Sequence, residues 1–155
     1  MTAYHARDVG RVVSLQTKRE HFEALEPVQA FRATALGLAG DRHAGREHGK
    51  RQILIAEEAS LSDLDLKPGD LREQLTVDLP GLMSMAPGTR LRVGEAVLEL
   101  TGVCEPCTHI GEHLGAKDPE ALRQRLVGRR GMLARVVGDG AIRRDDQVQV
   151  EDGVG

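Results

Sequence analysis

Short apolar runs separated by glycine and proline dominate the hydrophobic pattern of this chain. Residues 10–17 and 27–36 have the composition of strands, and residues 51–56 form a continuous apolar run short enough for a buried strand. In residues 71–79, apolar and polar positions alternate, as in a strand with one buried face. The first half of the chain is therefore predicted to be rich in β-structure.

Two later segments predict β-hairpins. In residues 89–102, apolar residues alternate on both sides of a tight connection at Gly94 and Glu95. Residues 131–152 repeat this design around a Gly-Asp-Gly turn and end in a final alternating strand.

Helical patterns are fewer. Residues 56–66 are compatible with one helix that ends before a proline. In residues 118–128, Asp118 can cap a helix, the following proline suits its first turn, and Leu122 and Leu126 share one face. The pattern predicts a mainly β fold, a barrel with two or three short peripheral helices, and it places the helix of residues 118–127 on the outside.

The composition limits the class of protein. A chain of 155 residues, 40% hydrophobic and 29% charged, is expected to form one globular domain over residues 1–155. No apolar run is long enough for a membrane span and no leader segment is recognisable, so we expect a cytoplasmic protein. A net charge of -3 and only Tyr4, Phe22 and Phe31 as aromatic residues argue against nucleic-acid binding.

The segment TGVCEPCTHIGEH contains both cysteines, Cys104 and Cys107, with His109 and His113 close behind. Three interpretations are open on the residues alone. A zinc site would need all four side chains around one ion, although they are packed unusually tightly along the chain. A thioredoxin-like redox pair needs a helix through the second cysteine, which Pro106 disfavours. The thiols could also be small buried hydrophobic groups, but the surrounding glycines and proline indicate a loop, where reactive groups are often displayed.

Two glycine-rich segments carry basic residues. Residues 37–52 contain four glycines together with Asp41, His43 and several arginines, and residues 128–131 read Gly-Arg-Arg-Gly. Each segment could be a solvated turn, or it could line a site in which arginine forks bind a phosphate. The glycine spacing matches neither a P-loop nor a dinucleotide-binding fingerprint.

The order of these features resembles the MOSC domain. The matching segments are GLAGDRHAG, RQILI, LKPGDLREQLTV, APGTRLRVGEAVLELTG, CEPC and GRRGMLARVVGDGAIRRDDQVQV. The resemblance covers residues 10–151, and it implies a β-barrel in which a cysteine preceded by proline is the signature residue. That residue corresponds to Cys107.

The resemblance also implies a function. Related proteins bind the pterin molybdenum cofactor (molybdopterin), with this cysteine as a ligand of molybdenum or as a persulfide-carrying group. Some reduce N-hydroxylated compounds, and sulfurases transfer sulfur to the cofactor. We accordingly expect Cys107 to be the catalytic and metal-ligating residue, with Cys104 and Asp41 in secondary roles. The expected cofactor-binding residues are Arg42, His43, Arg51, Arg72, Arg129 and Arg130.

The chain differs from the family pattern at two residues and in its N-terminal part. Gln74 stands where the family has asparagine, and Asp145 stands where it has a turn glycine. The resemblance begins near residue 10, so we expect no counterpart of the N-terminal module that helps to hold the pterin in molybdenum reductases. No pyridoxal-phosphate site is expected in this chain, so a sulfur donor would be a separate pyridoxal-phosphate-dependent cysteine desulfurase.

Two functions of different class follow. The chain is either an enzyme that carries out reductive or sulfur-transfer chemistry at Cys107, or a non-catalytic module that holds sulfur or cofactor for a partner. Candidate partners are the desulfurase, a molybdoenzyme or an electron donor.

Overall fold

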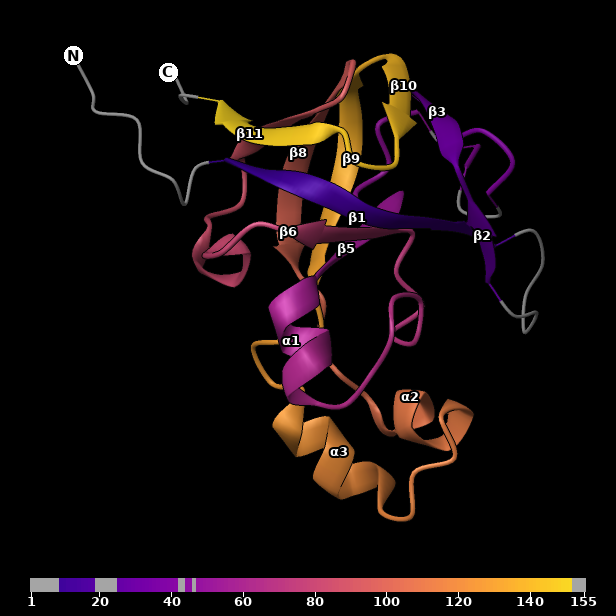
Figure 1. Cartoon of the computed structure of the whole chain (residues 1–155), viewed down its shortest axis with the longest axis vertical. Coiled ribbons are helices and arrows are strands. Elements are labelled where there is room, and N and C mark those ends of the chain that lie inside the picture. Colours follow the sequence, from indigo (N-terminus) through magenta and orange to yellow (C-terminus); the bar gives the residue numbers. More distant parts are fainter. Residues whose placement is uncertain (1–8, 19–24, 42–43, 46, 152–155) are drawn as a thin grey trace.

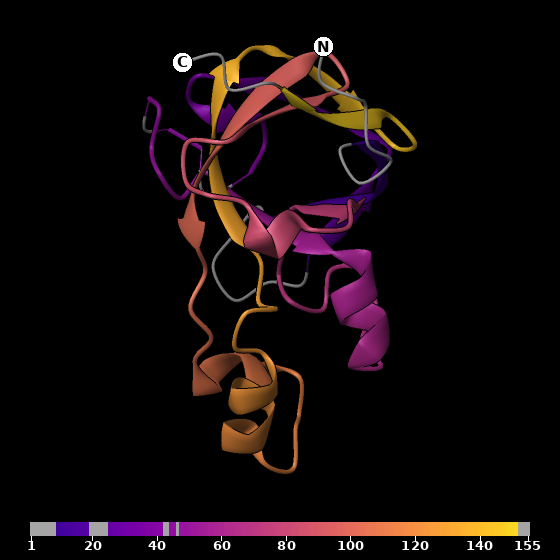
Figure 2. The ribbon, with the colours of Figure 1, turned by 90° about the vertical axis from the view of Figure 1, so that its left-hand side faces the viewer.

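A computed structural model describes residues 9–18, 25–41, 44–45 and 47–151 of the chain. Its centre is a closed barrel of seven strands, which Figure 2 shows end-on as a ring. The strand order is β11-β7-β8-β9-β5-β6-β1, and pairing between β1 and β11 closes the ring. The strands are β1 (Val9–Thr17), β5 (Ile53–Glu57), β6 (Leu75–Asp78), β7 (Arg90–Val93), β8 (Ala96–Val103), β9 (Met132–Gly138) and β11 (Gln147–Glu151).

The remaining strands lie outside this ring. Strand β2 (Glu26–Val28) pairs with β1, and β3 (Ala30–Thr34), β4 (Gly37–Leu38) and β10 (Gly140–Arg143) form a separate three-stranded sheet. A short 3-10 helix, η2 (Leu82–Ser84), follows β6. The predicted mainly β barrel is therefore confirmed.

One strand pair of the barrel is parallel, and its connection explains the first helix. Strands β5 and β6 run side by side with Ile55 opposite Leu75. Because parallel neighbours cannot be joined by a tight hairpin, the chain needs a crossover. Helix α1 (Glu58–Asp63) lies in this crossover, within the segment for which a helix was predicted.

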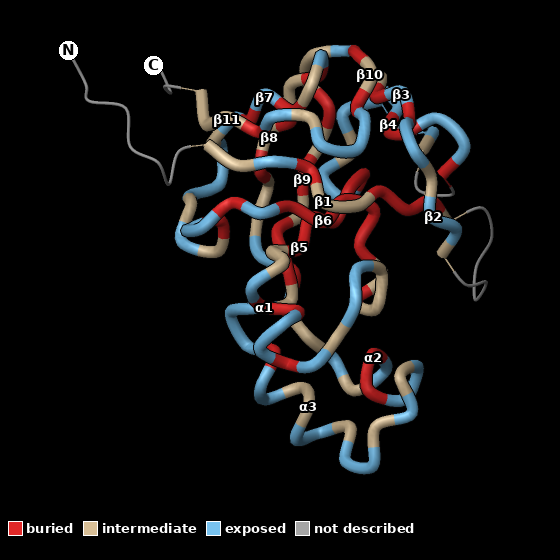
Figure 3. The backbone as a smooth tube through the Cα atoms, viewed as in Figure 1, coloured by how far each residue is buried: buried red, intermediate tan, exposed pale blue. Residues whose placement is uncertain are grey.

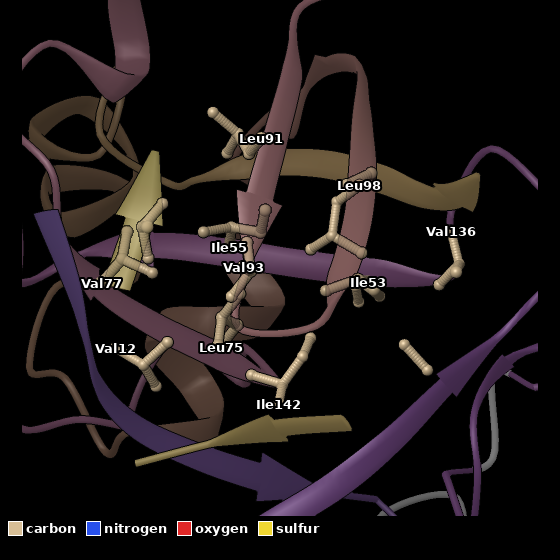
Figure 4. Close-up of a cluster of buried hydrophobic side chains, with 14 of the residues drawn as sticks. Val12, Ile53, Ile55, Leu75, Val77, Leu91, Val93, Leu98, Val136 and Ile142 are labelled. Atoms are coloured by element: carbon tan, nitrogen blue, oxygen red, sulfur yellow. The ribbon is translucent and has the colours of Figure 1, made fainter. Parts of the chain in front are cut away.

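The barrel interior is filled by aliphatic side chains. Alternate residues of the β7–β8 hairpin point inward: Leu91 and Val93 on β7, and Leu98 and Leu100 on β8, are almost completely buried. Figure 4 shows side chains from strands on all sides meeting in this core. The period of two along a strand thus accounts for the alternation seen in the sequence.

Helices α2 (Thr108–His113) and α3 (Pro119–Arg125) form a lobe outside the barrel, between β8 and β9 (Figure 1). The side chain of Asp118 accepts a hydrogen bond from the amide of Ala121, so the predicted cap of α3 is confirmed. A second, smaller apolar cluster joins the lobe to α1 and to the barrel. In Figure 3 the buried positions gather in the barrel, and no residue of α3 itself is buried.

Three details differ from the sequence prediction. Residues 27–36 contain parts of two strands, β2 and β3, that belong to different sheets. The alternating segment of residues 71–79 begins as a loop, and only β6 is a strand. Residues 131–152 do not form a hairpin between β9 and β10, because β10 pairs with β3 while β11 pairs with β7 and β1.

The backbone around Gly140 explains the third difference. A Cβ atom at Gly140 would lie 2.4 Å from the carbonyl group of Glu95, so the chain passes directly against the β7–β8 turn here. The amide of Glu95 also donates to the carbonyl oxygen of Ala141 at 3.0 Å. This close approach turns β10 away from β9.

Within the described residues, no helix is long and apolar enough to cross a membrane.

Candidate functional site

The two cysteines lie on the segment that leads from the barrel into the lobe. The amide of Cys104 donates to the carbonyl oxygen of Gly131 at 2.9 Å, which continues the β8–β9 ladder by one step. Residues 104–107 then run without turn or bend, and Cys107 is the N-cap residue of α2 with extended dihedral angles (φ -134°, ψ 167°). Pro106 keeps the helix from starting earlier. The second thiol is thus placed before the helix rather than inside it.

The two thiols differ in exposure. Cys104 is 8% exposed and packs as part of the protein interior, whereas Cys107 is exposed to solvent. Neither forms a disulfide. Cys107 is therefore the thiol that an external sulfur donor, metal centre or substrate can reach.

The guanidinium group of Arg130 lies close to both thiols. It is partly buried, and one of its nitrogen atoms, Nη1, donates to the carbonyl oxygen of Leu71. Burial lowers the pKa of Arg130, while the charges of Cys104, Glu73 and Cys107 act in the opposite direction. A cation beside a thiol stabilises the thiolate, which is the nucleophilic and metal-ligating form.

A second guanidinium reinforces this field. Arg51 precedes β5, is exposed, and is close enough to Arg130 to contribute to lowering its pKa. Among the described residues, neither arginine forms an ion pair with a carboxylate. Two neighbouring guanidinium groups without such partners favour the binding of an anion near them.

The loop that holds Arg130 is organised by the buried carboxylate of Glu73. This carboxylate accepts hydrogen bonds from the amides of Gly69 (2.9 Å) and Leu71 (3.1 Å) and from the hydroxyl of Thr76 (2.7 Å). Burial raises the pKa of Glu73, and these hydrogen bonds oppose the effect. Three donors on one carboxylate fix the backbone of residues 69–73, and with it the carbonyl group that binds Arg130.

Arg72 lies on the same loop but points elsewhere. Its backbone is left-handed (φ 63°), an uncommon conformation for a residue other than glycine. Its Nη1 lies 3.1 Å from Nε2 of His113, at the end of α2. The loop therefore contacts the lobe on two sides: Leu71 binds Arg130, and Arg72 binds His113.

Asp41 and Gln74 form a buried polar pair near the start of β6. The amide nitrogen of Gln74 donates to Asp41 at 3.2 Å, and its amide oxygen accepts from the backbone of Leu54 at 2.9 Å. Asp41 also accepts from the amide of Lys18 at 2.8 Å. The glutamine that replaces the family's asparagine thus has both ends of its amide bonded.

The structure brings only part of the predicted set together. Arg130 is near enough to both thiols for their charges to act on it, and Arg51 is near Arg130, whereas Arg72 faces His113 and Arg129 is exposed just beyond α3. Arg42 and His43 lie outside the described residues, so their predicted position at the thiol stays a prediction. The sequence analysis missed Glu73 as an organising residue, which lies in the loop just before β6.

Among the described residues, no three His, Cys, Asp or Glu side chains are arranged to hold a metal ion. One accessible soft thiol with two adjacent guanidinium groups instead fits a metal that arrives within an anionic cofactor, because the thiol can complete the coordination and the arginines can bind the anion.

Comparison with known proteins identifies the family. The MOSC domain profile matches residues 39–149, so this chain belongs to the MOSC domain family. The family is associated with molybdenum cofactor binding or sulfur-related chemistry. No curated protein sequence matches the chain significantly.

Solved structures share the fold. The YuaD protein of Bacillus subtilis is 20% identical with a TM-score of 0.81, and the match covers 92% of this chain and 95% of that one. YiiM of Escherichia coli is 21% identical with a TM-score of 0.67, over 94% of this chain and 71% of that one. YiiM of Geobacillus stearothermophilus is 18% identical with a TM-score of 0.73, over 94% and 77%. At these identities the likeness concerns the fold.

Proposed function

We propose that this MOSC domain uses the thiolate of Cys107 to hold sulfur or to ligate the molybdenum of the pterin cofactor. The observation that carries the proposal is the exposed thiol of Cys107 within reach of the charge of Arg130, which has Arg51 near it. The two guanidinium groups favour an incoming anion. A thiolate is also a soft ligand suited to a soft metal centre.

As a sulfur carrier, the chain would accept sulfur in a balanced exchange. The Cys107 thiolate attacks the terminal sulfur of a persulfide on a cysteine desulfurase. The sulfur–sulfur bond of the donor breaks, its cysteine leaves as a thiolate, and Cys107 becomes the persulfide. Arg130 and Arg51 stabilise the anionic sulfur before and after this transfer.

As a cofactor site, the same residues would have different tasks. Cys107 would ligate molybdenum, and Arg51 and Arg130, with Arg42 and His43 as further candidates, would bind the anionic part of the pterin. When bound, the cofactor would supply the redox chemistry of a reductase. The residues of this chain would position it and balance its charge.

The two cysteines provide the test. We expect Cys107→Ser to abolish persulfide labelling after incubation with a pyridoxal-phosphate-dependent cysteine desulfurase and L-cysteine, and to abolish retention of molybdenum and pterin. A serine hydroxyl has nearly the size of the thiol but stays protonated near neutral pH. The matched control is Cys104→Ser, which we expect to keep most of both capacities.

Two measurements on Cys107→Ser and Cys104→Ser test the proposed role of Cys107. Persulfide content is read by tag-switch labelling, and metal and pterin content by elemental analysis and fluorescence of protein purified from a molybdenum-competent host. Full retention in Cys107→Ser, or equal losses in the two variants at unchanged melting temperature, would contradict the proposed role.

A further inference from the structure

The segment that contains the two cysteines is extended. Residues 104–107 have no turn or bend, and Figure 2 shows the chain running here from the ring of the barrel to the lobe. The residues favour this form, because Pro106 fixes its own φ at about −65° and keeps Glu105, which precedes it, out of the helical region. In an extended chain, the Cα atoms of residues three positions apart are about 9–10 Å from each other.

This separation is too long for a disulfide between Cys104 and Cys107. The Cα atoms of two bridged cysteines are at most about 7 Å apart. The exposure of the thiols agrees with this, since Cys104 is only 8% exposed whereas Cys107 is open to solvent. The thiol of Cys104 also donates to the carbonyl oxygen of its own neighbour, Glu105, at 4.0 Å. The two thiols are therefore not arranged to react with each other.

Both ends of this segment are held by the fold. At its start, the amide of Cys104 donates to the carbonyl oxygen of Gly131 at 2.9 Å, in continuation of the β8–β9 ladder. At its end, Cys107 is the N-cap residue of α2. A Cβ atom at Gly111 of this helix would lie 2.8 Å from Pro119, so α2 is packed directly against the start of α3. To bring the thiols together, the chain would have to break the ladder or detach α2 from α3.

We propose that Cys107 works as a single-thiol site, from which bound sulfur leaves only to a thiol outside this chain. The chain has two cysteines, so no third thiol of its own can take the place of Cys104. The inference deepens the function proposed for Cys107 and rests on it for the nature of the sulfur that is carried. It adds the class of reaction that must follow, which is transfer to an external thiolate.

Two reactions could discharge a persulfide on Cys107. In the internal reaction, the thiolate of Cys104 would attack Sγ of Cys107, the sulfur–sulfur bond would break, and the outer sulfur would leave as hydrosulfide while an internal disulfide forms. In the external reaction, an acceptor thiolate attacks the outer sulfur, Cys107 leaves as a thiolate, and the acceptor becomes the persulfide. The internal reaction wastes the sulfur as sulfide. The separation of the two cysteines prevents this loss until an acceptor thiol arrives.

The test replaces the persulfide by a coloured adduct, so that it does not depend on a sulfur donor. The full chain is treated with dithiobis(nitrobenzoate), which leaves a nitrothiobenzoate group on the exposed Cys107, and excess reagent is removed. We expect the native wild type to keep this group. In concentrated urea at the same pH, Cys104 should displace it on the order of a hundredfold faster, because the segment is then free to bring the thiols together.

Cys104→Ser is the matched control, and it should keep the group in both conditions. An added external thiol should release the group from the native wild type and from native Cys104→Ser at equal rates, followed by absorbance and by mass spectrometry. Rapid release from the native wild type with formation of the internal disulfide would overturn the proposal. Retention by the unfolded wild type would overturn it too, because distance would then not be what limits Cys104. Neither outcome bears on whether Cys107 accepts sulfur from a desulfurase, so the two proposals can fail separately.

Discussion

Arg130 connects the cysteine segment with the loop of residues 69–73. Its guanidinium group lies near both thiols and donates to the carbonyl oxygen of Leu71, and Glu73 binds the amide of the same residue. This hydrogen bond ties the guanidinium group to the loop. The position of its charge near the thiols therefore depends on the backbone of residues 69–73.

Replacing this charge should slow the chemistry of the exposed thiol. We expect Arg130→Gln to reduce the rate of Cys107 alkylation by iodoacetamide near neutral pH by roughly three- to tenfold, because the thiolate loses a neighbouring cation. Arg130→Lys, which keeps the charge, should lose less. Rates are measured by mass spectrometry in a Cys104→Ser background. An unchanged rate in a folded Arg130→Gln protein would show that the guanidinium does not act on this thiol.

At the scale of the strands, Glu99 links the outer faces of β7, β8 and β9. Its carboxylate accepts from Arg135 at 2.6 Å and from Arg90 at 3.2 Å, and these residues lie on the strands on either side of β8. The hydrogen bond from Arg135 is the main reason that the pKa of Glu99 lies below its ordinary value, with Arg90 contributing further. This cross-strand triad stabilises the barrel from outside.

The triad predicts a defined pH dependence of stability. Because the pKa of Glu99 is lower in the folded state than in the unfolded chain, its contribution is present above the ordinary pKa of about 4.3 and is lost as the pH falls through the folded value. We expect Glu99→Gln to lower the free energy of unfolding by about 0.5–1 kcal/mol near neutral pH.

Denaturant unfolding between about pH 3 and pH 7 checks this expectation, because this range includes the ordinary pKa of a glutamate. The difference between the wild type and Glu99→Gln should vanish toward the acidic end. Glu112→Gln, a change at an exposed glutamate on α2, is the matched control. A difference that does not depend on pH would mean that the ion pairs contribute nothing.

The elements could be predicted from the sequence wherever the contacts that decide them are local. Inward-facing residues such as Leu91 and Val93 alternate with exposed ones, and Asp118 caps α3 through a hydrogen bond three residues away. The partner of β10 could not be predicted, because it is chosen by the close passage of Gly140 against Glu95. At Asp145, where the resemblance indicated a missing turn glycine, the backbone is indeed left-handed (φ 68°).

The site was predictable only in part, because contacts between residues that are distant in sequence form much of it. Cys107 could be singled out from its sequence context, and a loop position was expected from Pro106 and the nearby glycines. The convergence of Arg51, Arg130 and Glu73 depends on how β5, β6 and β9 pair, which the sequence does not show directly. Glu73 carries no motif of its own that marks it as buried.

At the scale of the whole molecule, the residues that the structure describes form two apolar cores of unequal size. The barrel core contains residues of nearly every strand, whereas the smaller cluster joins α1, α2 and the end of α3. Leu126 is fully buried in the smaller cluster, and its neighbour Val127 is 59% exposed. Because few buried residues hold the lobe, it should open at a lower free energy than the barrel.

A pair of neighbouring substitutions tests this difference. We expect Leu126→Ala to cost about 2–4 kcal/mol in the lobe and to accelerate amide hydrogen exchange in α2 and α3, while β8 and β9 keep their protection. Val127→Ala should change exchange little, because its side chain is exposed. If exchange accelerates equally in the barrel strands, the two cores unfold as one cooperative unit.

The way in which the lobe is attached has a consequence for how this protein can change. Val103 pairs with Met132, and the amide of Cys104 bonds to Gly131, so the lobe leaves and re-enters the barrel at adjacent points of one antiparallel ladder. In effect the lobe is an insertion in the connection of a β-hairpin. The ladder already holds the two ends together, so the length of the insert adds little to the entropy of closing it. Evolution or design can therefore replace the lobe, together with Cys107, by another segment while the barrel keeps its strand order.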